Sequence, residues 1–263
     1  MTARPLSTLD GLATGVGLES SLLSEVESAI RGVALALMLY GSQARGSADP
    51  DSDVDVLQVV PQNPGSYKAG RVSVTAYTPN HLHQMAAKGS LFILHLRTEG
   101  IRLTDPHGVL TRALDAYRPP AGYQRLVDEL TAAAGALVVD RDQFREHFRS
   151  LGRLGIYLLR SYLYMTTIEA GAPDFDVDVA AARYGGELLR VVRLRRAEEL
   201  SYADALAIRA QVIALFEVRP HGKTLAGLAV DLARTDPQAS MLIAQAMTDV
   251  GSMNYTATAL PPR

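Results

Sequence analysis

The stretch LMLYGSQARGSADPDSDVDVLQVV, residues 37–60, places four aspartates between two short apolar segments. Each apolar segment has the length of a buried strand, and Gly41 and Ser42 end the first one. Carboxylates gathered in this way repel one another unless a positive charge lies among them. A strand-loop-strand unit does not need such a cluster for stability, so the stretch indicates a site that holds a cation or a ligand.

Asp53 and Asp55 begin the second apolar segment, and the two-residue period of a strand puts both side chains on one face. Their apolar neighbours make paired carboxylates costly there without a cation. Carboxylate oxygens suit a hard cation such as Mg²⁺, and a nucleoside triphosphate would supply the remaining oxygens. Asp49 and Asp51 are interpreted instead as solvated residues of the loop.

The end of the first apolar segment has features that suit a phosphate. Gly41 allows the backbone to approach a ligand closely. The hydroxyl of Ser42 and the N–H groups of a following helical turn can hold phosphate oxygens. Arg45, one turn further on, can add a charge-assisted hydrogen bond.

Gly41-Ser42, ten further residues and then Asp53-x-Asp55, with apolar strands on both sides, resemble the signature of the polymerase-β-type nucleotidyltransferase superfamily. The version Gly-Ser-Gln-Ala-Arg-Gly resembles its minimal nucleotidyltransferase branch. The resemblance is specific over 34–60 and loose up to about residue 117. It implies Mg²⁺-dependent transfer of a nucleoside monophosphate from an NTP to a hydroxyl, with Asp53 and Asp55 as catalytic metal ligands and pyrophosphate as the second product.

One position departs from the family pattern. Active members usually carry a third carboxylate on the next strand, where it completes the metal site and can act as a general base. The strand predicted over 70–77 offers Ser73 at that position, which can hold a water or a substrate oxygen but supplies no charge. Three alternatives follow: the enzyme works with two carboxylates, another acid such as Asp105 reaches in, or catalysis is lost.

The fold class expected is a small mixed-sheet α+β domain followed by an all-α helical bundle. RPPAG, residues 118–122, is the clearest break, so the expected domains are a nucleotidyltransferase domain over 1–118 and a helical domain over 119–263. In the first domain we predict strands over 33–40, 53–60, 70–77 and 101–103, helices over 18–32, 79–88, 91–98 and 106–117, and a turn or loop over 61–66. In the second we predict helices over 123–138, 141–170, 176–198, 201–218, 222–234 and 237–250.

Four arginines recur at every fourth residue near the start of the second domain: Arg141, Arg145, Arg149 and Arg153. On one helix they form a slowly drifting stripe. We predict that Arg149 and Arg153 contact the NTP phosphates; the alternative is a solvated face paired with acidic neighbours. The Arg141–His147 spacing also resembles that of the HEPN ribonucleases, which gives a third, weaker interpretation: an RNase in the helical part.

The composition of the chain excludes several classes of protein and of site. The 263 residues hold 26 Lys and Arg against 28 Asp and Glu, a net charge of −2, so there is no basic excess typical of non-specific nucleic-acid binding. The absence of cysteine excludes disulfides, thiolate metal sites and cysteine nucleophiles. The N-terminus lacks a signal peptide's apolar core, and no apolar run reaches the roughly 18 residues of a membrane helix. We expect a cytoplasmic protein without a membrane partner.

Two functions of different classes remain. The first is a Mg²⁺-dependent nucleotidyltransferase that uses ATP or another NTP and modifies a tRNA, a protein side chain or a small molecule. The second is a degenerate member that binds nucleotide or a partner protein without turnover, for example a regulatory or antitoxin component, and Ser73 motivates it. A toxin–antitoxin role follows from the resemblance to the minimal branch alone.

Overall fold

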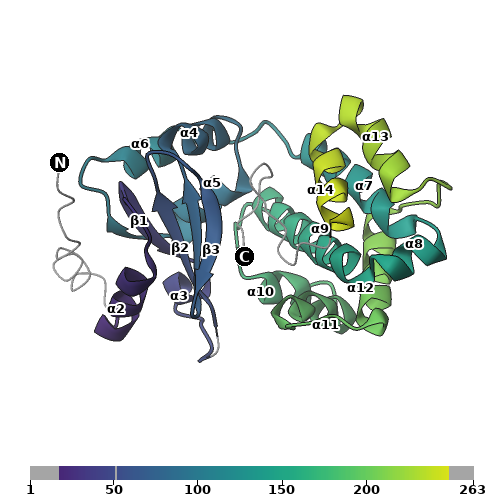
Figure 1. Ribbon diagram of the computed structural model, residues 1–263, viewed down its shortest axis with the longest axis horizontal. Helices are drawn as coiled ribbons and strands as arrows, with labels where there is room; N and C mark the ends of the chain where they lie inside the picture. The colour runs from purple at the N-terminus through teal and green to yellow at the C-terminus, as the bar shows by residue number, and fades with distance from the viewer. Residues whose placement is uncertain (1–17, 51, 249–263) are drawn as a thin grey trace. The chain divides into compact units, whose positions relative to one another are not determined.

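The computed structural model describes residues 18–50 and 52–248 of the chain. The chain divides between Pro120 and Ala121 into two compact units, both drawn in Figure 1. The first unit is built on a sheet, and the second is helical throughout its described residues. The predicted mixed sheet followed by an all-helical part is therefore confirmed. Asp51 and the last two residues of the helix predicted over 237–250 lie outside the described residues.

Five strands form one mixed sheet in the order β3-β4-β2-β1-β5. β2 and β4 run parallel, and the other neighbouring pairs are antiparallel. The strands are β1 (Ala36–Tyr40), β2 (Val54–Val59), β3 (Gly65–Ala69), β4 (Val72–Tyr77) and β5 (Ile101–Thr104). β1 and β2 are the two apolar segments on either side of the aspartate-rich loop, as predicted.

β3 is the strand that the sequence analysis missed, because the prediction ended its loop at residue 66 and left 67–69 unassigned. Its side chains are half exposed or fully exposed, so the segment lacks the apolar pattern of a buried strand. It is held by antiparallel pairing with β4, from Gly65 opposite Ala76 to Ala69 opposite Val72. Gly70, with φ of +59°, makes the tight turn between the two strands, and for that reason β4 begins at Val72 rather than at residue 70.

Helices cover both faces of the sheet (Figure 1). α2 (Ser20–Ala29) packs Leu22, Leu23 and Val26 against one face. The other face lies under α4 (Pro79–Ala87), α5 (Leu91–Glu99) and α6 (Val109–Asp115). That second face carries Met38, Tyr40 and Leu57. Asp55, which pairs with Tyr40, lies on the same face and therefore at the edge of a packed apolar core.

The second unit is built around α9 (Phe148–Glu169), whose 22 residues include 14 that are buried. Such a helix is apolar nearly all round because neighbours pack on most of its surface. The surrounding elements are α7 (Gln124–Ala134), η1 (Gly135–Val138), α8 (Arg141–Glu146), α10 (Val177–Ala182), α11 (Gly186–Arg193), η2 (Leu194–Arg196), α12 (Tyr202–Phe216), α13 (Leu225–Thr235) and α14 (Pro237–Met247). Among the described residues, none of the helices is long and apolar enough to cross a membrane.

The helix predicted over 141–170 is in fact two helices. His147 adopts φ −110° and ψ 20°, outside the helical region, and ends α8 where α9 begins. The four-residue arginine repeat is therefore divided, with two arginines on each helix. The single drifting stripe inferred from the spacing was wrong, because the spacing alone does not show a one-residue break in the backbone.

α9 and α12 pack closely because Gly152 and Gly155 present no side chain to α12. A Cβ at Gly152 would lie 2.8 Å from Leu200 Cδ1, just before α12, and 3.6 Å from Ala205 Cβ on it; one at Gly155 would clash with Ile208 Cγ2. We expect Gly155→Ala to lower the free energy of unfolding by about 1–3 kcal/mol through overpacking. Thermal unfolding followed by circular dichroism measures this, and the melting temperature should fall by several degrees.

Gly186→Ala is the matched control, because Gly186 also lies in a helix of this unit and a Cβ there meets no atom within 4 Å. The higher helix propensity of alanine should leave the melting temperature unchanged or slightly raised. Equal melting temperatures for the two variants would contradict the close α9–α12 contact.

Candidate functional site

The register of the sheet places two of the predicted site residues, Asp55 and Ser73, in one row across the strands. Asp55 on β2 lies opposite Tyr40 on β1 and, on its other side, opposite Ser73 on β4. Ser73 in turn lies opposite Lys68 on β3. Directly paired residues share one face of a sheet, so the four side chains extend from the same face at the same level.

Gly41 follows β1 directly and touches the carboxylate of Asp55. Its backbone has φ 76° and ψ −153°, a region open essentially to glycine alone. A Cβ built there would lie 2.6 Å from Asp55 Oδ2, closer than real contacts allow. The sequence predicts that Gly41 lets the backbone approach a ligand closely; the structure adds that the same glycine makes room for the Asp55 carboxylate.

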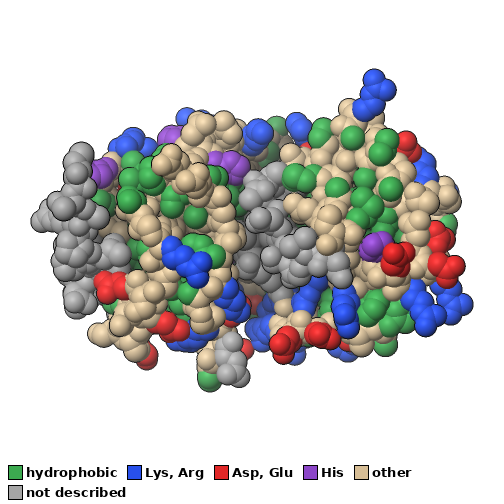
Figure 2. Space-filling model, in the orientation of Figure 1, with side chains coloured by type: hydrophobic (Ala, Val, Ile, Leu, Met, Phe, Trp, Pro, Cys, Tyr) green, Lys and Arg blue, Asp and Glu red, His purple; other side chains and the backbone are tan. Residues whose placement is uncertain are grey.

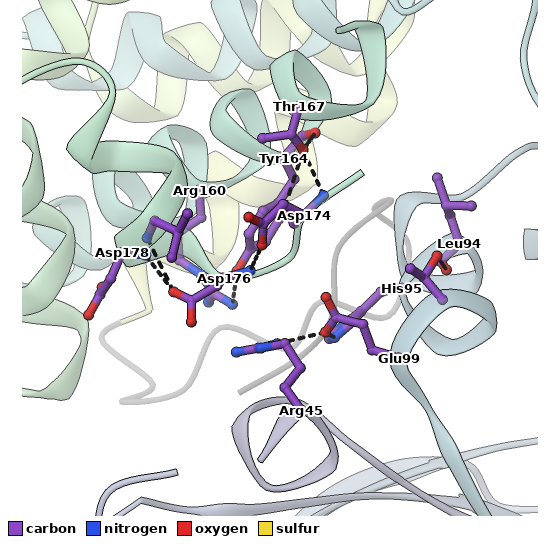
Figure 3. A network of polar contacts seen from close by, with 12 residues as sticks. Arg45, Leu94, His95, Glu99, Arg160, Tyr164, Thr167, Asp174, Asp176 and Asp178 are labelled. Carbon is purple, nitrogen blue, oxygen red and sulfur yellow. Dashed lines mark hydrogen bonds and ion pairs between the residues drawn. The ribbon is translucent and has the colours of Figure 1, made fainter. Parts of the chain in front are cut away.

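Ser42 and Arg45 lie in α3 (Ser42–Arg45), the single helical turn that follows Gly41. Arg45 Nη1 is 2.7 Å from Glu99 Oε2, and the two side chains are only 20% and 11% exposed. His95 Nε2 lies 3.1 Å from the same oxygen of Glu99. Figure 3 shows Arg45 and His95 on either side of that carboxylate. The guanidinium predicted to bind phosphate is thus fixed in direction by an internal ion pair.

The carboxyl of Glu99 has a lowered pKa. Burial alone raises the pKa of this group, but the hydrogen bond and charge of His95 and then those of Arg45 outweigh burial. The ionised form is therefore the one that the fold stabilises. His95 packs at right angles to the ring of Tyr40, with ring centroids 5.7 Å apart, so this cluster is continuous with the apolar core.

Acidification should weaken this unit of the protein through Glu99. A carboxyl with a lowered pKa in the folded state contributes stability above its ordinary pKa of 4.5 and loses it as the pH falls through the lower folded value. We expect Glu99→Gln to lower the melting temperature near neutral pH and to lose that effect as the pH falls below 4.5 and through the lower folded pKa. Thermal unfolding of both proteins from about pH 7 to 3 measures the difference, provided that acid-induced aggregation is monitored.

Glu146→Gln is the control for that measurement, because the Glu146 side chain is 72% exposed and its Oε1 lies 4.0 Å from His147 Nε2. The control should follow the wild type at every pH. A constant difference between wild type and Glu99→Gln down to the lowest pH would contradict a lowered pKa at Glu99.

Asp53 precedes β2 and forms an ion pair with Lys68, whose Nζ lies 3.0 Å from Asp53 Oδ1. The side chains are 50% and 58% exposed, so the pair contributes at most about 1 kcal/mol to stability. Lys68 is the site residue that sequence reasoning missed, because its strand was not recognised. The available signal was the Gly70-Arg71 dipeptide, which can join two strands as a hairpin and thereby bring Lys68 opposite Ser73.

Among the described residues of the sheet, the position on β4 opposite Asp55 is held by Ser73 and not by an acidic residue. Asp105 follows β5, which lies beyond β1 in the strand order and so on the far side of β2 from β4. Its carboxylate accepts hydrogen bonds from the backbone of Leu110 and from the backbone and hydroxyl of Thr111 at the start of α6. Burial raises the pKa of Asp105, but these hydrogen bonds outweigh it and hold the pKa below its usual value.

Arg149 and Arg153, predicted to contact the NTP, both have partners within the helical unit. Arg153 donates to the carbonyl oxygens of Leu194, Arg195, Ala197 and Glu198 and so fixes the segment that follows α11. Arg149 is 58% exposed and lies 3.4 Å from Glu199. Their contact with an NTP stays a prediction.

The donor set fits one divalent cation that arrives with a triphosphate. Asp53 directly precedes β2 and Asp55 lies on it, and a Cβ at Gly41 would come within 2.6 Å of Asp55 Oδ2, so glycine leaves room for this carboxylate. In the described part of the chain, no group of three or more Asp, Glu, His or Cys side chains could hold a metal alone. Mg²⁺ is commonly held by one or two carboxylates together with substrate phosphates, which matches this set.

Acidic and basic side chains are interspersed on the face of the molecule drawn in Figure 2. On that face neither unit carries a field of one sign. This agrees with the balanced charge of the whole sequence.

Comparisons with known proteins were made for the whole chain. Residues 21–81 match the family model of the nucleotidyltransferase domain, a range that runs from α2 into α4 and includes Gly41, Asp53, Asp55 and Ser73. A nucleotidyltransferase-like protein from Exiguobacterium sibiricum is a structural neighbour at 14% sequence identity, with 69% of this chain and 68% of that chain covered. Its TM-score of 0.29 is too low to support an argument. No protein with a curated description matches the chain.

Proposed function

We propose that this chain, whose residues 21–81 match the family model of the nucleotidyltransferase domain, transfers a nucleoside monophosphate from an NTP to an acceptor hydroxyl. One observation supports this most directly. The backbone that follows β1 turns at Gly41 in a conformation open to glycine and lies against the carboxylate of Asp55. A phosphate-binding turn and a metal-binding carboxylate in contact are what transfer of a nucleotide requires.

In this proposal the residues divide into two groups. Gly41, Ser42 and Arg45 hold the triphosphate through backbone N–H groups, a hydroxyl and a guanidinium. Asp53 and Asp55 hold Mg²⁺, which when bound neutralises charge on the phosphate oxygens. Arg45 is directed by its ion pair with Glu99, so it is oriented before the substrate arrives.

The proposed reaction is an in-line displacement. The acceptor oxygen forms a bond to the α-phosphorus, the bond from that phosphorus to the α,β-bridging oxygen breaks, and pyrophosphate leaves. The acceptor's proton passes to water, because the Ser73 hydroxyl has no charge with which to take it as a carboxylate would. Ser73 is 9% exposed and lies beside Asp55, so its role in the proposal is to hold that water or a phosphate oxygen.

In this proposal the helical domain selects the acceptor. Residues 1–118 supply the transfer chemistry, and 119–263 select the acceptor, with Arg149 and Arg153 as its candidate contacts to the triphosphate. A tRNA end, a protein side chain and a small molecule are the candidate acceptors. A cytoplasmic location and a partner protein, as in a toxin–antitoxin pair, belong to the same proposal.

The test is a labelling experiment with the full chain, Mg²⁺ and each of the four α-³²P-labelled NTPs, incubated separately with the RNA, the protein and the low-mass fraction of a cell lysate. We expect label in one fraction with at least one NTP and release of unlabelled pyrophosphate. A small-molecule acceptor would be found as a labelled low-mass product by thin-layer chromatography. Absence of label in every fraction, with each NTP, would overturn the proposed transfer.

A second candidate function is favoured by Ser73, since an uncharged residue stands where active members usually carry an acid. In that case the chain binds nucleotide or a partner protein without turnover. Isothermal titration with the same NTPs separates the two functions: binding without label supports the second, and metal-dependent label that Asp53→Ala abolishes rejects it.

A further inference from the structure

A lysine lies next to the position where the family's third carboxylate would be. Ser73 stands opposite Asp55, and Lys68 stands opposite Ser73 on the other side. The Lys68 ammonium reaches back across this row to Asp53, at 3.0 Å. Ser73 therefore removes the negative charge that the third carboxylate of active members would supply, and Lys68 on the neighbouring strand adds a positive charge.

The two differences act in the same direction on the charge of the site. Three carboxylates carry three negative charges, which suffices to gather two divalent cations together with a triphosphate. Here Asp53, Asp55 and Lys68 sum to one negative charge. A site of that charge attracts one divalent cation, whereas a second one would have to approach an ammonium at close range.

We propose that Lys68 takes the place of a second divalent cation, so that this site works with one metal ion; this rests on the proposed nucleotidyl transfer. More than half of the Lys68 side chain is exposed, and its four-carbon stem is flexible. The ammonium can therefore give up Asp53 when the cation binds and neutralise phosphate oxygens beside Ser73. Lys68 is a positioning and charge-balancing residue of the site.

Mn²⁺ serves as the probe, because its electron paramagnetic resonance spectrum distinguishes one bound ion from two neighbouring, exchange-coupled ions. The full chain is titrated with Mn²⁺ in the presence of each α,β-methylene NTP, which cannot undergo transfer. We expect one uncoupled Mn²⁺ per chain in the wild type. The double variant Ser73→Asp with Lys68→Met should bind two Mn²⁺ and show a coupled spectrum.

The single variant Lys68→Met tests the lysine without a change in the carboxylates. Removal of the ammonium should tighten Mn²⁺ binding roughly three- to tenfold, the range for loss of one partly screened charge. Lys88→Met is the matched control: it removes the same charge from an exposed residue of the same unit and should leave the affinity unchanged. Lys68→Gln, which keeps a polar side chain, should behave as Lys68→Met does.

Two coupled ions in the wild type, or equal Mn²⁺ affinities of Lys68→Met and Lys88→Met, would overturn the one-metal proposal and leave nucleotidyl transfer intact. A different result would contradict the proposed function itself. If Asp55→Asn bound Mn²⁺ and the nucleotide analogue as the wild type does, neither ligand would use this site.

Discussion

Asp55→Asn should reduce transfer from the labelled NTP by at least about a hundredfold, because loss of a residue that merely supports a metal ligand already costs 10- to 100-fold. The substitution keeps the size of the side chain and removes its charge. The asparagine would still fit beside Gly41, so the melting temperature should change little. Initial rates at saturating Mg²⁺ and NTP, together with thermal unfolding, measure both quantities.

Asp49→Asn is the control for this prediction, since it removes the same charge from the exposed loop before β2. It should retain transfer within about twofold, the effect of one screened surface charge. Asp53→Asn should resemble Asp55→Asn and not the control. If all three variants kept wild-type rates, the two strand aspartates would have no part in the reaction.

Gly41→Ala should also lower transfer by about a hundredfold, although it alters no charged group. The backbone at φ 76° and ψ −153° costs an alanine roughly 1–3 kcal/mol, and its Cβ would lie 2.6 Å from Asp55 Oδ2. The carboxylate must then move, and a displacement of about 1 Å in a reacting site can cost 10²-fold. Rates and NTP affinity are the measurements.

Gly32→Ala separates loss of the site from backbone strain. Gly32 also has a positive φ, of 67°, but a Cβ there meets no atom within 4 Å. We expect it to lower the melting temperature to a similar extent while the transfer rate stays within about threefold, because strain at a remote loop acts on folding and not on the carboxylates. Similar rates for Gly41→Ala and Gly32→Ala would show that contact with Asp55 does not matter for transfer.

The result of the labelling experiment with the wild type decides which variants are informative next. If the wild type transfers label, the aspartate and glycine variants test the mechanism, and the Mn²⁺ titration tests the number of metal ions. If it binds NTP without transfer, Ser73→Asp becomes the informative variant. Restored transfer in Ser73→Asp would show that the missing carboxylate, opposite Asp55 in the sheet register, is the cause.

Local sequence was sufficient for most of the fold. β1 and β2 were predicted from apolar runs, and β4 was predicted from alternation with β-branched residues. The helix over 18–32 was predicted from apolar residues at helical spacing, because a buried element carries the periodicity of its secondary structure. β3 was missed because all five of its side chains are at least partly exposed, so this edge strand lacks the apolar pattern of a buried strand. The break at His147 was missed because the hydrophobic pattern continues across it.

For the candidate site, too, some features follow from the sequence and others only from the tertiary structure. The sequence by itself determined which residues could do the chemistry: Gly41, Ser42, Asp53 and Asp55 are specified by type and spacing along one continuous stretch. Only the tertiary structure decided what surrounds them. Strand pairing brings Ser73 beside Asp55 and Lys68 beside Ser73, and packing of α5 on the sheet brings Glu99 and His95 to Arg45. Arg45 and Glu99 are 54 residues apart in the chain, and a linear pattern holds no record of distances that are set by register and packing.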